Sequence, residues 1–120
     1  MQMYTVVSKE AIKKMNGIRG KMMTQAGHAI LHSFWDAEQR FPKEAADYKN
    51  SDHAKKITCV VETEAELIAL RDRYREVCGV SLVKDAGFTV FNEPTITFLG
   101  IGPLREEDIG SDLKKLPLFT

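Results

Sequence analysis

Three side chains from two distant segments, Lys21, Asp85 and Thr89, supply an ammonium, a carboxylate and a hydroxyl, which are enough to orient water and stabilise an oxyanion. A carboxylate can orient a water molecule and take its proton, an ammonium can stabilise an oxyanion, and a hydroxyl can hold the water in place. Lys21 opens a helical segment, whereas Asp85 ends a strand-like segment and Thr89 follows an Ala-Gly turn. Because strand ends and helix N-termini meet at one edge of an open α/β sheet, we expect the three groups to converge. The alternative for Asp85 and Thr89 is ordinary turn chemistry.

The segment before Lys21 is basic. Residues 9–21 hold five basic residues and one acidic residue, which leaves twelve basic and sixteen acidic residues elsewhere. A lysine in the first turn of a helix opposes the helix dipole at a cost of a few tenths of a kcal/mol, whereas an anion is favoured there. The segment is therefore either a solvated loop or a basic corner that binds phosphate, for which Lys14 and Arg19 are the candidate substrate-binding residues.

Polar and aromatic side chains follow Lys21 at helical spacing. Gln25 and His28 are candidate substrate-binding residues on the side of the helix that carries Lys21. His28 and His32 are four residues apart, the spacing at which two imidazoles on a helix can share a metal. A metal site needs a further ligand, and none is evident: His53 falls in a polar linker. The alternative is a solvated helix face.

Composition and motif spacing exclude several classes of protein. The 17 basic and 17 acidic residues cancel, which argues against a domain that wraps nucleic acid with its whole surface. Residues 17–21, GIRGK, are not a P-loop, because two residues instead of four separate the glycines and Met22 follows the lysine. No apolar run approaches the roughly 20 residues of a membrane span, and the N-terminus resembles no signal peptide. We therefore expect a cytoplasmic protein with no membrane partner.

Hydrophobic periodicity predicts the elements that position these residues. Four strands are expected at residues 3–8, 55–62, 80–85 and 95–103. One helix is expected from Met22 to about Gln39, with a core stripe of Met23, Ala26, Gly27, Ile30, Phe34 and Ala37, and with Pro42 ending it. A second helix is expected between Thr63 as N-cap and Gly79 as C-cap, with Leu67, Leu70, Tyr74 and Val77 buried.

The segments between these elements are expected to be irregular: a loop at residues 9–20 and a polar linker at residues 41–54. A short reversal is expected near residues 92–94, and a short helix or turn near the C-terminus. The predicted architecture is an α/β single domain over residues 1–120, with a four-stranded mixed sheet flanked by helices.

Three motifs in this order resemble the type II peptidyl-tRNA hydrolases. GKMMTQAGHA (20–29), KDAGFT (84–89) and TITFLGIGP (95–103) are similar to the family patterns GKxxAQxxHA, DAGxTQ and TxxxxGP. The likeness extends to AELIAL (65–70) and LKKLPLF (113–119), so it covers nearly the whole chain.

The resemblance implies a function as well as a fold. It implies hydrolysis of the ester between a peptide and the 3′ ribose of tRNA, without a metal or other cofactor, and the acceptor end of peptidyl-tRNA as the partner. Lys21, Asp85 and Thr89 match the essential residues of the family, and Gln25 and His28 match positions beside the site. We expect Lys21 to contact tRNA phosphate or the developing oxyanion, and Asp85 with Thr89 to position water.

Departures from the family pattern define a second hypothesis. Phe88 stands at a position that is usually polar or basic, Val90 replaces a glutamine, residues 92–94 replace a Gly-Ser turn, and residues 8–10 replace an arginine-aspartate segment. The alternative is a catalytically weak or inactive homologue that binds tRNA ends or a protein. The oligomeric state is left open between a monomer and a homodimer.

Overall fold

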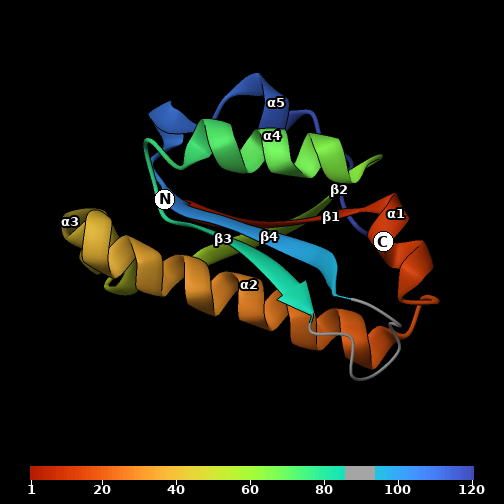
Figure 1. Cartoon of the computed structure of the whole chain (residues 1–120). Coiled ribbons are helices and arrows are strands. Elements are labelled where there is room, and N and C mark those ends of the chain that lie inside the picture. Colours follow the sequence, from red (N-terminus) through yellow and green to blue (C-terminus); the bar gives the residue numbers. More distant parts are fainter. Residues whose placement is uncertain (86–93) are drawn as a thin grey trace.

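Alternating β-branched and apolar residues form four strands, and helices form between the first and second strands and between the second and third strands. The computed structural model describes residues 1–85 and 94–120. In chain order the elements are β1 (Gln2–Ser8), α1 (Lys9–Lys14), α2 (Arg19–Arg40), α3 (Pro42–Lys49), β2 (Lys55–Val61), α4 (Glu64–Tyr74), β3 (Val80–Asp85), β4 (Thr95–Leu104), a 3-10 turn (Glu106–Asp108) and α5 (Ser111–Lys114) (Figure 1). The four predicted strands are confirmed. The predicted reversal at residues 92–94 lies largely outside the described residues.

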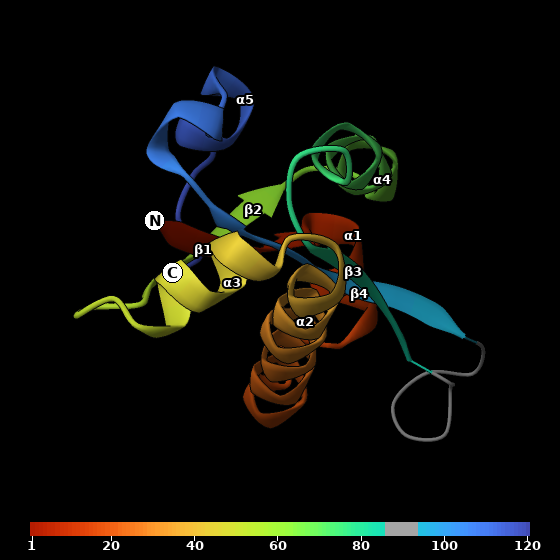
Figure 2. The ribbon, with the colours of Figure 1, turned by 90° about the vertical axis from the view of Figure 1, so that its left-hand side faces the viewer.

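The strands form one mixed sheet in the order β2-β1-β4-β3. β1 and β2 are parallel, and β4 is antiparallel to both β1 and β3. Helices α2 and α3 lie on one face of the sheet and α4 and α5 on the other (Figures 1 and 2). The predicted α/β fold with a mixed sheet flanked by helices is confirmed. Within the described part of the chain, no helix is both long and apolar enough to cross a bilayer.

The buried side of α2 differs from the predicted stripe. The buried residues of α2, four apart, are Gln25, Ala29, Ser33 and Ala37. Met23, by contrast, is 74% exposed, and Gly27 is exposed as well. The reason is a close approach between backbones: a Cβ on Gly100 of β4 would lie only 2.1 Å from the carbonyl oxygen of Ala29. Ala29 and Ser33, rather than large apolar residues, therefore lie where the helix comes closest to the sheet.

Two segments predicted to be irregular are helical. Ser8 caps α1 by accepting a hydrogen bond from the Ala11 backbone N–H at 3.0 Å, so part of the predicted loop at residues 9–20 is a helix. The predicted linker at residues 41–54 contains α3, because Pro42 fits the first turn of a helix, where its missing N–H has no cost.

The predicted ends of α4 are half right. Thr63 is the N-cap, since its hydroxyl accepts from the Glu66 backbone N–H at 3.2 Å. The helix ends at Tyr74, however, well before Gly79, so Val77 falls in the following turn and is 42% exposed. Gly79 instead allows a close approach to α2, because a Cβ there would lie 2.4 Å from the Ser33 carbonyl oxygen.

Both cysteines, Cys59 and Cys78, are buried free thiols. Burial raises the pKa of Cys78 to about 12 and raises the pKa of Cys59 as well. Because the thiolate is the reactive form, we expect no measurable reaction with a thiol-specific disulfide reagent at pH 8 in the native state, and two thiols per chain after unfolding in guanidinium. Rapid labelling of the native protein would contradict this packing.

Candidate functional site

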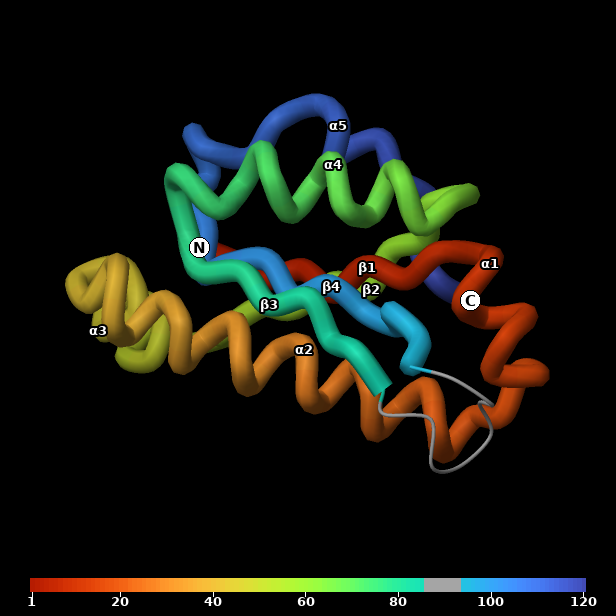
Figure 3. The backbone as a smooth tube through the Cα atoms, in the orientation of Figure 1, coloured from red at the N-terminus to blue at the C-terminus, as the bar shows by residue number. Residues whose placement is uncertain are grey.

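The end of β3 and the first turn of α2 bring Lys21 and Asp85 together. The Lys21 Nζ lies 2.5 Å from Asp85 Oδ2, and the two side chains are only 15% and 10% exposed. Figure 3 shows the reason: the chain of β3 ends beside the N-terminal half of α2. An ion pair shielded from water interacts more strongly than one on the surface. The predicted convergence of these two residues is confirmed.

The carboxylate of Asp85 is oriented by a buried glutamine. Gln25, one helical turn after Lys21 and 5% exposed, donates from Nε2 to Asp85 Oδ2 at 3.2 Å. The amide of Gln25 is itself fixed, because the hydroxyl of Thr97 donates to its Oε1 at 3.2 Å. Thr97 is fully buried in β4. A relay of side chains therefore runs from the sheet to the ion pair.

A β-bulge explains how Thr97 reaches Gln25. Leu82 pairs with Leu99 and Lys84 with Ile96, so β4 has one more residue than β3 in this stretch. The extra residue lets two consecutive β4 side chains face α2: Phe98 packs with Ala29 there while Thr97 contacts Gln25. Sequence reasoning missed Thr97, and its only signal was one of two threonines in a mainly apolar strand.

A variant that lacks the Thr97 hydroxyl tests the role of this relay. Thr97→Val keeps the shape of the side chain and removes the hydroxyl that donates to the buried Gln25 Oε1. We expect hydrolytic activity to fall about 5- to 30-fold and the free energy of unfolding to fall by about 1 to 2 kcal/mol. Kinetics with chemical denaturation measures both. Thr24→Val, at an exposed position of α2, is the control, and equal effects from the two variants would contradict the relay.

A cavity of about 410 Å³ opens beside the ion pair, between α2 and β3. Gln25, His28 and His32 line it from the helix, and Lys84 and Asp85 line it from the strand. His28 therefore lies beside the ion pair, and its role in substrate binding stays a prediction. The rings of His28 and His32 are 5.8 Å apart, but the described residues contain no group of three potential ligands that could hold a metal ion.

The remaining predicted residues lie elsewhere. Lys14 is exposed in the last turn of α1. Arg19 is exposed in the first turn of α2 and lines a different cavity, with Met23 and Phe119. Thr89 lies outside the described residues.

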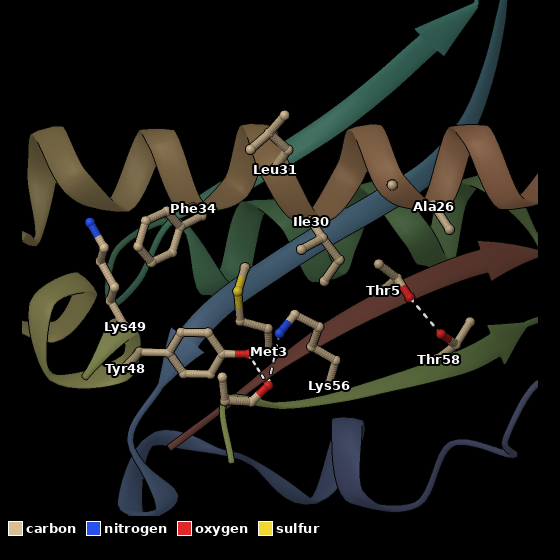
Figure 4. Close-up of a pocket in the computed structure, with 12 residues that line it drawn as sticks. Met3, Thr5, Ala26, Ile30, Leu31, Phe34, Tyr48, Lys49, Lys56 and Thr58 are labelled. Carbon is tan, nitrogen blue, oxygen red and sulfur yellow. Dashed lines mark hydrogen bonds between the residues drawn. The ribbon is translucent and has the colours of Figure 1, made fainter. Parts of the chain in front are cut away.

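A second hollow, of about 570 Å³, lies on the other side of α2, above β1 and β2 (Figure 4). Its walls are mainly apolar, with Ile30 and Phe34 from α2 facing Met3 from β1 and with Leu31 at the rim. Lys56 at its edge donates to the Ala54 carbonyl oxygen at 2.8 Å. The carboxylate and amide groups that could activate water lie on the β3 side of the helix instead.

Fold and site define an α/β protein with a lysine–carboxylate pair at one end of a mixed sheet. The chain belongs to the peptidyl-tRNA hydrolase PTH2 family, whose model matches residues 1–119. A peptidyl-tRNA hydrolase of Methanocaldococcus jannaschii is 38% identical over 92 residues, which cover 76% of this chain and 79% of that protein. One of Methanococcus vannielii is 35% identical over 102 residues, covering 84% and 87%. A probable peptidyl-tRNA hydrolase 2 of Drosophila melanogaster is 34% identical over 92 residues, covering 76% and 49%.

Proposed function

We propose that this chain hydrolyses the ester bond between the peptide and the 3′ ribose of peptidyl-tRNA, and so recycles tRNA. Membership of the PTH2 family over residues 1–119 supports the activity. The single observation that carries the chemistry is the shielded contact between Lys21 and Asp85. In one site, a carboxylate can take a proton from the attacking water and an ammonium can stabilise the developing oxyanion of the ester.

In the proposed reaction, Asp85 accepts a proton from water as the water oxygen attacks the ester carbonyl carbon. The carbonyl oxygen becomes negatively charged, and the Lys21 ammonium moves from Asp85 toward it. When the bond from the carbonyl carbon to the ribose oxygen breaks, the proton held by Asp85 passes to that oxygen. The products are the 3′-hydroxyl of tRNA and the free carboxyl group of the peptide, which keeps the second proton of the attacking water and then releases it to solvent.

Other residues are assigned supporting roles. Gln25 holds the Asp85 carboxylate in the orientation that faces the water, which its 3.2 Å hydrogen bond supports. Thr89, four residues after Asp85, is assigned to water positioning on the basis of the family motif. Lys14 and Arg19 are assigned to tRNA phosphates, because both are exposed cations near the N-terminus of α2.

Location and assembly extend the proposal. Because the substrate arises from translation, we place the activity in the cytoplasm. The active protein is either a monomer or a homodimer, and sedimentation velocity of the pure protein distinguishes the two.

Release of a labelled N-acetyl-aminoacyl group from tRNA tests the proposal. We expect the pure protein to release the acyl group with turnover and to leave full-length tRNA with a free 3′-hydroxyl. The control is the same tRNA charged through a non-hydrolysable 3′-amide. Tight binding of the ester substrate without release would contradict the proposal.

A further inference from the structure

Three rings form a ladder along the exposed side of α2, starting at the cavity beside the ion pair. The ring centroids of His28 and His32 are 5.8 Å apart, and those of His32 and Trp35 are 5.1 Å apart. His28 and His32 are exposed, and Trp35 is 49% exposed. The proposed hydrolysis gives none of these rings a part in bond cleavage. Large rings left in water at successive turns of one helix offer a surface for a flat ligand.

The position of the ladder relates it to the reacting ester. Lys21 and His28 lie two turns apart on one side of α2, and Trp35 lies two turns further, so the ladder ends about 20 Å from Lys21 at 1.5 Å per residue. The first two rings line the same cavity as Asp85. A substrate whose ester sits at the ion pair can therefore extend along the ladder with the part of its chain next to the ester.

The charge around the ladder fits a polyanion. Lys84 is exposed on β3 and borders the cavity opposite the two histidines. Two acids near the ladder are already paired: Asp85 contacts Lys21 at 2.5 Å, and Asp36 is bound by Arg40 at 2.6 Å, which lowers the pKa of Asp36. Nucleotides in a single strand combine flat bases with phosphates, and proteins bind them with rings for the bases and with cations for the backbone.

From these observations we infer that the ladder of His28, His32 and Trp35, with Lys84, binds the unpaired 3′-terminal nucleotides of the tRNA by base stacking. The inference rests on the proposed function. Two rings that sandwich a base must be about 6.8 Å apart, twice the stacking distance of 3.4 Å. The observed 5.8 Å and 5.1 Å are shorter, so the bases stack on the outward faces of the rings.

Trp35 is the only tryptophan in the chain, so its fluorescence reports directly on the ladder. Titration with the ribonucleotide 5′-ACCA-3′, which has no ester to hydrolyse, is expected to quench this fluorescence saturably. His32→Ala and Lys84→Ala should each weaken the binding several-fold. Met23→Ala, an exposed position on the other side of α2, is the control and should leave the titration unchanged.

A kinetic arm separates binding from chemistry. Trp35→Ala is expected to raise KM for peptidyl-tRNA roughly 5- to 50-fold with kcat within about twofold, whereas Trp35→Phe, which keeps a ring, should stay within about threefold of the wild type. Circular dichroism confirms that both variants fold.

The two arms distinguish failure of this inference from failure of the proposed function. If ACCA quenches the fluorescence but the protein does not turn over peptidyl-tRNA, the inferred binding site is supported and the proposed hydrolysis is wrong. Normal turnover with an unchanged KM in Trp35→Ala, and no quenching by ACCA, would overturn the inference. Quenching by an N-acetyl peptide but not by ACCA would also overturn it, since the peptide would then occupy the ladder.

Discussion

Replacing Lys21 by alanine is expected to lower kcat/KM for an N-acetyl-aminoacyl-tRNA by about 10²- to 10³-fold, with most of the loss in kcat. The ammonium lies 2.5 Å from Asp85 in a largely shielded site, where its charge acts on the oxyanion with little screening by water. A group that interacts with charge developing in the transition state contributes to kcat more than to binding. Steady-state release of labelled acyl group over a range of substrate concentrations measures both constants.

Two further variants make this result specific. Lys21→Met keeps the aliphatic stem and should lose as much activity as Lys21→Ala, because only the charge matters. Lys49→Ala removes an exposed lysine from α3, near the other hollow, and should retain activity within about twofold. If Lys21→Met kept most of the activity, the assignment of electrostatic stabilisation to the Lys21 charge would be wrong.

The largest expected effect on stability is at Gly100. A Cβ there would lie 2.1 Å from the Ala29 carbonyl oxygen and 2.8 Å from the Ser33 Cβ, and a backbone atom cannot yield as a flexible side chain can. Gly100→Ala must therefore push α2 away from β4, at a cost of about 3 kcal/mol in the free energy of unfolding and roughly 10 °C in Tm. Because α2 carries Gln25 and β4 carries Thr97, the activity of Gly100→Ala should also be reduced at temperatures below its Tm, where the variant is still folded.

Gly27→Ala is the matched control for Gly100→Ala. Gly27 is exposed in the interior of α2, and a Cβ there has nothing within 4 Å. Alanine should stabilise the helix by about 0.5 to 1 kcal/mol, so the same chemical change has opposite signs at the two positions. Urea denaturation measures both. Equal effects would show that close packing of α2 on β4 does not control stability.

Local patterns in the sequence predicted the strands well, because each has β-branched or apolar runs bounded by turn residues. The same patterns placed Lys21 in the first turn of a helix and Asp85 at the end of a strand, which was enough to predict their convergence. The N-cap at Thr63 was predictable because capping is a local interaction.

Features that depend on partners in the fold were not predictable. The predicted hydrophobic stripe shares only Ala37 with the buried residues of α2, because Gly79, just before β3, and Gly100 of β4 bring the backbone close to small residues of the helix. The relay from Thr97 to Gln25 depends on a one-residue bulge in β4. The pattern of apolar and polar residues in this strand does not predict a bulge. The helices α1 and α3 were missed because each is short and its sequence is mostly polar.

A double-mutant cycle between Lys21 and Asp85 tests the central claim most directly. The cycle compares kcat/KM for the wild type, Lys21→Ala, Asp85→Asn and the double variant on one N-acetyl-aminoacyl-tRNA. If the ammonium and the carboxylate act as one unit, the double variant should lose little more activity than the more severe single variant, which leaves a coupling of about 10²-fold. Losses that simply multiply would contradict the account, because the two groups would then act independently.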